Sequence, residues 1–141
     1  MELFQVEQWM NKNVVTCSRE ASASNVAELM YRNNIGSVVV VEGDMPVGIV
    51  TERDIVRQIV AKKRNPDQTS VMEIMSTSLV TVEVGTTISQ VSEKMVKFRI
   101  KKMPVVDGAK LKGIITSTDI VRTMAAFNKL YEVKDIIELG A

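Results

Sequence analysis

Two threonine–aspartate pairs are the residues with the clearest potential for chemistry. Thr51 is followed three residues later by Asp54, and Thr116 is followed in the same way by Asp119. At the start of a helix, free N–H groups and a threonine hydroxyl form a phosphate site, and a carboxylate one turn in can accept both hydroxyls of a ribose. The same spacing is also that of a capping box, which only stabilises the helix start. The spacing alone leaves both interpretations open.

Both pairs belong to a phrase that the chain contains twice. GIVTERDIVR begins at Gly48, and GIITSTDIVR begins 65 residues later at Gly113. The two glycines are expected to allow a close approach of the backbone. Further residues match at the same offset without a gap: Val6 with Val71, Met10 with Met75, Met30 with Met95, and Gly43 with Gly108. The sequence therefore contains two copies of one supersecondary unit.

Hydrophobic periodicity predicts the order strand, helix, strand, strand, helix in each unit. The segments 13–16 (NVVT) and 78–81 (SLVT) are short strand candidates, and helical stripes follow at Val26, Leu29, Met30 and at Ile88, Val91, Met95. In the first unit, the β-branched run 37–44 ends in a Gly-Asp turn signal, a second strand resumes at 46–51, and a helix starts near Glu52. Continuous Val and Ile runs predict strands that are covered on both faces.

This pattern predicts an α/β (α+β) fold made of two β-α-β-β-α repeats. Residues 1–65 are assigned to the first repeat with an N-terminal segment and the start of a linker, 66–125 to the second repeat, and 126–141 to a C-terminal helical extension. A repeat of about sixty residues has a marginal core, so the two repeats are expected to pack together as one module. The polar stretch 62–70 carries Pro66 and is the predicted linker.

Composition excludes several function classes. The 141 residues carry a net charge of +1, so bulk charge favours neither nucleic acid nor a membrane as partner. Cys17 is the only cysteine and histidine is absent, which excludes an intrachain disulfide, metal sites built on thiolate clusters or imidazole, and a histidine base. The apolar runs are too short for a membrane span, and the first residues lack the layout of a signal peptide. The sequence predicts a cytoplasmic protein.

The two long copies, IGSVVVVEGDMPVGIVTERDIVR and IKKMPVVDGAKLKGIITSTDIVR, resemble a tandem pair of cystathionine-β-synthase (CBS) domains over about residues 5–125. The resemblance implies a stand-alone, non-catalytic regulatory module with pseudo-twofold symmetry. Clefts between the repeats would hold an adenosine-containing ligand such as AMP, ADP, ATP or S-adenosylmethionine, with no catalytic cofactor. It also implies a homodimer formed through helices and a change of shape that an effector protein senses.

By position, the resemblance assigns ligand contacts to matched residues in both repeats. The ribose would be held by Asp54 and Asp119, phosphate by Thr51 and Thr116, and the base by Ile49 and Ile114. The adenine would be flanked by Gly36, Ser37 and Val38 in one repeat and by Lys102, Met103 and Pro104 in the other. Arg53 and Thr118 stand between Thr and Asp in the two motifs, and Thr16 and Thr81 are weaker candidates because Val-Thr is also ordinary strand composition.

The two motifs differ in ways that affect phosphate binding. In the first, Arg53 could meet a phosphate, but the neighbouring Glu52 would repel it if it points inward. The second motif keeps hydroxyl donors, and Lys101 and Lys102 lie in the same repeat. The sequence therefore favours the second site for a phosphorylated ligand.

Two other function classes remain as alternatives. The first is a dimerisation scaffold or nucleic-acid adaptor without a small ligand, for which Lys97, Arg99, Lys101 and Lys102 are the basic candidates, although no aromatic residues interleave with them for base stacking. The second is an enzyme that uses Thr116 or Ser117 as nucleophile, but no suitable base stands beside them. No catalytic residue and no metal site is assigned, and the chain is not predicted to be an enzyme.

Overall fold

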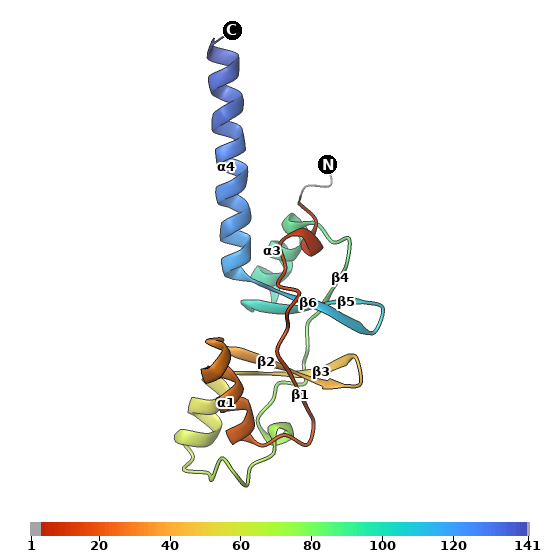
Figure 1. Cartoon of the computed structure of the whole chain (residues 1–141), viewed down its shortest axis with the longest axis vertical. Coiled ribbons are helices and arrows are strands. Elements are labelled where there is room, and N and C mark those ends of the chain that lie inside the picture. Colours follow the sequence, from red (N-terminus) through yellow and green to blue (C-terminus); the bar gives the residue numbers. More distant parts are fainter. Residues whose placement is uncertain (1–3, 141) are drawn as a thin grey trace.

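The computed structural model describes residues 4–140, with side chains described for residues 4–130. Expectations for residues 1–3 and 141 lie outside this part. The chain forms two three-stranded sheets, one from β1 (Thr16–Ser18), β2 (Ser37–Glu42) and β3 (Met45–Thr51), the other from β4 (Val82–Glu83), β5 (Lys102–Asp107) and β6 (Lys110–Thr116). The sheets lie next to each other in the middle of the molecule (Figure 1). The predicted α+β fold of two repeats is confirmed.

Each sheet combines one parallel and one antiparallel pairing. The first strand runs parallel to the second, with Cys17 opposite Val40 and Val82 opposite Val105. The second and third strands form an antiparallel hairpin in both repeats. Its turn passes through Gly43 with φ of 61° or Gly108 with φ of 63°, the left-handed region that glycine adopts without steric cost.

The first helix of each repeat begins at a capping box and buries one apolar stripe. α1 (Ala23–Asn33) follows Ser22, whose hydroxyl accepts from the Asn25 N–H, and α3 (Ile88–Phe98) follows Thr87 in the same way. Both helices are followed by a left-handed residue, Asn34 and Arg99 respectively. Within the predicted stripes, Val26, Met30, Ile88, Val91 and Met95 are buried.

The second helices of the repeats differ from each other. After β3, the chain forms one α-helical turn, α2 (Glu52–Asp54), and then a π-helical segment, η3 (Ile55–Val60), in which the Ala61 N–H bonds to the Val56 carbonyl five residues earlier. After β6, α4 (Ser117–Gly140) is α-helical throughout and projects beyond the rest of the molecule (Figure 1). The predicted C-terminal extension is therefore a continuation of α4 up to Gly140. No helix within residues 4–140 is long and apolar enough to cross a membrane.

The leading segments of the two repeats are exchanged in space. The 3₁₀ turn η2 (Val6–Gln8) packs in the core of the second repeat, where Val6 is fully buried and its N–H bonds to Thr86 O at 2.8 Å. The matching turn η4 (Val71–Glu73) packs in the core of the first repeat, and the Val71 N–H bonds to Ala21 O at 2.9 Å. Each core thus contains residues from both halves of the sequence.

This exchange also explains why the first strands start later than predicted. β1 begins at Thr16 and β4 at Val82, so most of the segments 13–16 and 78–81 are not strand. Just upstream of these segments, the chain is held by the other repeat: Asn11 bridges to Ile114 and Ser76 bridges to Ile49. The residues between these bridges and the strands pass between the two sheets.

Candidate functional site

Both Thr-x-x-Asp pairs form the predicted capping boxes. The Thr51 N–H donates to Asp54 Oδ2 at 2.9 Å, and the Asp54 N–H donates to Thr51 Oγ1 at 3.3 Å. Thr116 and Asp119 repeat this geometry with the same two distances. The backbone N–H of the residue that follows each threonine is also engaged. The Glu52 N–H donates to Gly36 O, and the Ser117 N–H donates to Lys101 O. Two of the first three backbone N–H groups at each helix start are therefore already engaged and do not serve a phosphate.

The first cleft has a volume of about 420 Å³ and is built from both repeats. The first repeat contributes the end of β3 and the start of α2, with Ile49, Thr51, Arg53 and Asp54. The second repeat contributes Ser76, Ser78 and Val80 from the segment before β4, residues 99–101 from the loop between α3 and β5, and Lys102 from the start of β5. The cleft therefore offers an apolar wall, hydroxyl groups, one carboxylate and several cations.

The second cleft is smaller, with a volume of about 180 Å³. Its Thr-x-x-Asp motif comes from the second repeat, which contributes Ile114, Thr116 and Asp119. The first repeat contributes the rest: Asn11, Asn13, Val14, Val15, Ile35, Ser37 and Val39. None of these residues is a lysine or an arginine.

The two clefts are related by the sequence repeat. Thr51, Asp54 and Ile49 match Thr116, Asp119 and Ile114 at the 65-residue offset. On the opposite walls, the matched pairs are Ser76 with Asn11, Ser78 with Asn13, Val80 with Val15, Ile100 with Ile35, and Lys102 with Ser37. The pseudo-twofold relation implied by the sequence is thus visible in the residues that line the clefts.

The aspartates at the two motifs have different surroundings. Asp119 is 7% exposed, and its Oδ1 accepts from Arg122 Nη1 at 3.1 Å while its Oδ2 is used in the capping box. Asp54 is half-buried, and among the described residues only Oδ2 has hydrogen-bond partners. One oxygen of Asp54 is therefore free to accept a hydrogen bond from a ligand, whereas Asp119 has both oxygens engaged.

The structure corrects the expected position of the lysines. Lys101 and Lys102 line the first cleft, opposite Thr51 and Asp54, and not the cleft of Thr116 in their own repeat. The expectation that these lysines stand near the second motif was wrong, and the reason for favouring that site for a phosphorylated ligand is therefore lost. The physical reason is that each cleft joins the motif of one repeat to the α–β loop of the other.

The positions assigned by the resemblance do not all lie in a cleft. The structure brings Ile49, Thr51, Arg53, Asp54 and Lys102 to the first cleft, and Ser37, Ile114, Thr116 and Asp119 to the second. Val38, Met103 and Pro104 are fully buried and line neither cleft. Gly36, Thr81 and Thr118 line neither cleft.

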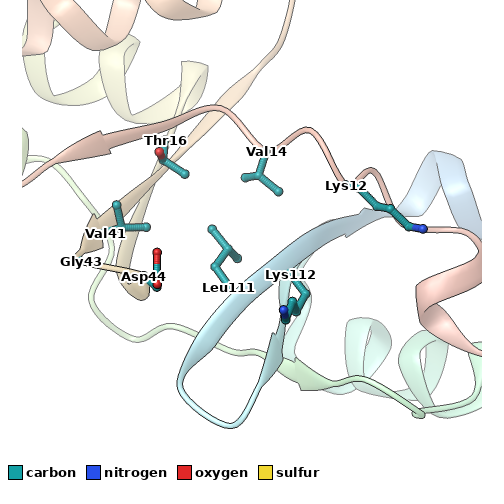
Figure 2. A pocket seen from close by; sticks show the side chains of 8 residues that line it. All are labelled: Lys12, Val14, Thr16, Val41, Gly43, Asp44, Leu111 and Lys112. Atoms are coloured by element: carbon teal, nitrogen blue, oxygen red, sulfur yellow. The ribbon is translucent and has the colours of Figure 1, made fainter.

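Thr16 lines a third cavity of about 210 Å³, shown in Figure 2. This cavity lies where the hairpin of the first repeat meets β6, and the Leu111 N–H bonds there to Asp44 O at 2.8 Å. Lys12 and Lys112 stand at its edge and Asp44 lies between the two sheets. Thr16 thus lines neither of the clefts that contain a Thr-x-x-Asp motif.

Sequence reasoning missed the residues that precede the first strands. Ser76, Ser78 and Val80 line the first cleft, and Asn11, Asn13 and Val15 line the second. A signal was present, because Val15 and Val80 match at the 65-residue offset and small polar residues, Asn13 and Ser78, stand two positions before them. Ile100 was also missed, although it directly precedes Lys101.

Comparison with known proteins gives a consistent assignment along the chain. The family model of the CBS domain matches residues 6–61 and 71–126. The CBS domain-containing protein YhcV of Bacillus subtilis is 34% identical over 115 residues, which cover 82% of this chain and 81% of that protein. An uncharacterized protein of Methanopyrus kandleri is 38% identical over 124 residues, which cover 86% of this chain and 63% of that protein. This chain spans 33% to 63% of the length of several archaeal relatives.

Solved structures show the same arrangement of elements. A protein with CBS domains from Burkholderia ambifaria is 32% identical with a TM-score of 0.80, covering 86% of this chain and 94% of that one. The CBS domain pair of protein MJ0100, solved in complex with 5′-methylthioadenosine and S-adenosyl-L-methionine, is 28% identical with a TM-score of 0.78, covering 86% of this chain and 96% of that one.

Proposed function

This chain belongs to the CBS-domain family, and on that premise we propose that it is a regulatory module that binds an adenosine-containing ligand in its first cleft. Candidates are AMP, ADP, ATP and S-adenosylmethionine. The observation that carries the proposal is the cleft of about 420 Å³ between the repeats, where Thr51 and Asp54 face an apolar wall. The ligand acts as a signal and not as a substrate.

The size and lining of the first cleft suit a nucleoside. Small-molecule sites typically have volumes of about 300–1,000 Å³ and combine apolar walls with a few polar groups. Ile49, Val80 and Ile100 supply the apolar surface for a base. The unpaired oxygen of Asp54 supplies an acceptor for ribose hydroxyls, which are hydrogen-bond donors. The ligands in the MJ0100 structure, 5′-methylthioadenosine and S-adenosyl-L-methionine, both contain adenosine.

Binding in this cleft would bias the relative placement of the repeats. Its walls come from β3 and α2 of one repeat and from the α3–β5 loop of the other. A ligand that contacts both walls stabilises those arrangements in which the walls are correctly spaced. We propose that an effector protein in the cytoplasm senses this shift, because we assign no catalytic group among the described residues.

We also propose that the module forms a homodimer through its second helices. Val56 and Val60 follow α2, and Val121 and Met124 lie on α4; these four apolar side chains are 57–66% exposed. Burying such side chains is favourable in water, by roughly 25 cal/mol per Å² of apolar surface. A second copy would offer the same apolar residues on its own helices.

The test of ligand binding is the melting temperature of the protein with millimolar AMP, ADP, ATP, S-adenosylmethionine or NAD, with cytidine as the control. A ligand at about 100 times its dissociation constant adds roughly 2.7 kcal/mol to the free energy of unfolding. We expect at least one adenosine compound, and not cytidine, to raise the melting temperature. The Asp54→Asn variant should lose most of the ligand-induced shift while it keeps most of the capping interaction.

If no adenosine compound shifts the melting temperature, the proposal fails. The alternative hypothesis, a dimerisation scaffold or nucleic-acid adaptor without a small ligand, then takes its place. A nucleic-acid adaptor would be recognised by affinity for oligonucleotides that falls steeply with added salt. Arg99, Lys101 and Lys102 would then be the first positions to substitute.

A further inference from the structure

We propose that the two clefts are functionally unequal: the first binds a polyphosphate chain attached to a nucleoside, as in a nucleoside di- or triphosphate, and the second does not. This inference rests on the proposed function and names the ligand class of the same site. It follows from the charges, hydrogen bonds and volumes of two clefts that otherwise match residue by residue.

The clearest difference is the charge on the cleft walls. The first cleft is lined by four cationic side chains: Arg53, Arg99, Lys101 and Lys102. At the 65-residue offset, their counterparts are Thr118, Asn34, Gly36 and Ser37, all uncharged. Both clefts are built on the same backbone arrangement. The four positive charges are therefore specific to the first cleft and are not required by the fold.

These cations are available to a ligand. Within residues 4–130, none of the four forms an ion pair. They also come from two walls: Arg53 from the first turn of α2 on one side, and Arg99 and Lys101 from the α3–β5 loop with Lys102 from the start of β5 on the other. A chain of two or three phosphates is long enough to contact several cations and offers each one a charged acceptor, which gives stronger hydrogen bonds than a neutral group does.

A second carboxylate, that of Glu52, stands close to one of these cations, Lys102. A Cβ atom on Gly36 would lie 3.1 Å from Lys102 Nζ and 3.4 Å from Glu52 Oε1, so both side chains approach the same point. With Asp54 and Glu52 counted against the four cations, the local charge remains positive. Glu52 is thus expected to weaken phosphate binding, and its removal should strengthen it.

Arg99 occupies a backbone position where arginine is not the easiest residue. It directly follows α3 with φ of 54°, a left-handed conformation that glycine adopts freely and asparagine tolerates. The matching residue after α1 is Asn34, with φ of 52°. An arginine at this position is not needed to end the helix, and its side chain lines the first cleft.

The second cleft lacks both the space and the free acceptor. Its volume of about 180 Å³ lies below the range of typical small-molecule sites. The Asp119 oxygen that would receive a ribose hydroxyl already accepts from Arg122. In the first repeat, the corresponding pair of Asp54 and Arg57 forms no ion pair among the described residues. A ligand in the second cleft would have to share an Asp119 oxygen with Arg122, a competition that the first cleft does not have.

The repeat itself supplies the variants that test this inference. Arg99→Asn and Lys102→Ser install the residues that the first repeat carries at the same backbone positions, so both variants should fold. Lys110→Ser, on the exposed start of β6, removes a positive charge away from the cleft and is the matched control. Isothermal titration calorimetry with ATP, adenosine, S-adenosylmethionine and inorganic triphosphate measures affinity and the number of sites.

We expect ATP to bind once per chain and at least about tenfold more tightly than adenosine or S-adenosylmethionine. Arg99→Asn and Lys102→Ser should each weaken ATP about tenfold, the usual loss for one hydrogen bond to a charged group, and should weaken adenosine much less. Glu52→Gln should tighten ATP, and Lys110→Ser should change nothing. Circular dichroism of each variant confirms that the fold is kept.

The outcomes separate this inference from the proposed function. Equal affinities for ATP, adenosine and S-adenosylmethionine, or two ATP sites per chain, would overturn the inference while the adenosine site stands. Binding of inorganic triphosphate that depends on Arg99 and is as tight as that of ATP, with no binding of adenosine, would overturn the adenosine function while the polyphosphate site stands. Absence of binding by all four compounds would overturn both.

Discussion

Gly48 faces Met75 so closely that a Cβ atom on Gly48 would lie 2.6 Å from the Met75 sulfur and 3.1 Å from the Ser76 carbonyl oxygen. In the second repeat, Gly113 faces Met10 and the Asn11 carbonyl in the same way. These contacts arise where each leading segment crosses the sheet of the other repeat, and Ile49 and Ser76 exchange two backbone hydrogen bonds there. The repeated glycine therefore makes room for the exchanged segment.

We predict that Gly48→Ala destabilises the protein by about 1–3 kcal/mol, the usual cost of overpacking a well-filled site. The measurement is the free energy of unfolding in urea. A double variant with Met75→Ala separates the two contacts, because it removes the flexible sulfur and leaves the Ser76 carbonyl in place. A coupling energy near zero would show that the sulfur contact is not the cause, and unchanged stability of Gly48→Ala would contradict the close approach itself.

The exchange also marks what the sequence could and could not predict. The repeat, the order of elements, the buried stripes of α1 and α3 and the capping boxes all follow from local patterns. The partner of each leading segment does not, because a short apolar turn around Val6 or Val71 fits either core equally well from its residue types. Only the three-dimensional structure places Lys102 opposite Thr51, and the assignment of the lysines to the wrong motif came from that missing information.

The residues that give the two clefts different charges are visible in the sequence. Their effect on the clefts could not be inferred without knowing that each cleft joins elements of both repeats. Arg99 and Lys101 looked like a surface patch, because the residues that they face lie about fifty positions upstream in the other repeat. Once the α3–β5 loop is known to lie opposite α2, the same residues become the wall of a cavity.

Cys17 provides a prediction about pH. It is buried in β1, and burial raises the pKa of its thiol. The folded state therefore holds the thiol proton to a higher pH than the unfolded state does, so this contribution to stability is complete below the ordinary thiol pKa and is lost as the pH rises through the raised one. We expect stability to fall more steeply above pH 9 in the wild type than in Cys17→Val. Valine is the control because Val82 fills the matching position, and identical pH profiles would contradict the prediction.

The exposed helix residues give a prediction about assembly. Val56 and Val121 match at the 65-residue offset and are 57% and 63% exposed. If the second helices form a dimer, placing glutamate at both positions puts four carboxylates in the interface, where burial of unpaired charge is strongly unfavourable. Sedimentation velocity at tens of micromolar should change from dimer to monomer in the double variant. Met45→Glu, on the hairpin of the first repeat, is the control, and a wild-type monomer would contradict the proposed dimer.

The exchanged turns lead to a prediction about where local stability lies. Val6 and Val71 are both fully buried, and each packs in the repeat to which the other belongs by sequence. Truncating either to alanine removes two buried methyl groups, at a cost of about 2 kcal/mol from the lost apolar burial and the cavity left behind. By size and burial the two variants are matched, so a difference between them reports only on location.

Native-state hydrogen exchange of single amides measures that location. In Val6→Ala we expect the largest loss of protection in β5 and β6, which belong to the other half of the sequence, and in Val71→Ala the largest loss in β2 and β3. The opposite result, with Val6→Ala opening β2 and β3 first, would show that the leading segments pack within their own repeats. Equal loss in both sheets would contradict the prediction and show that neither repeat opens without the other, so that the module unfolds as one unit.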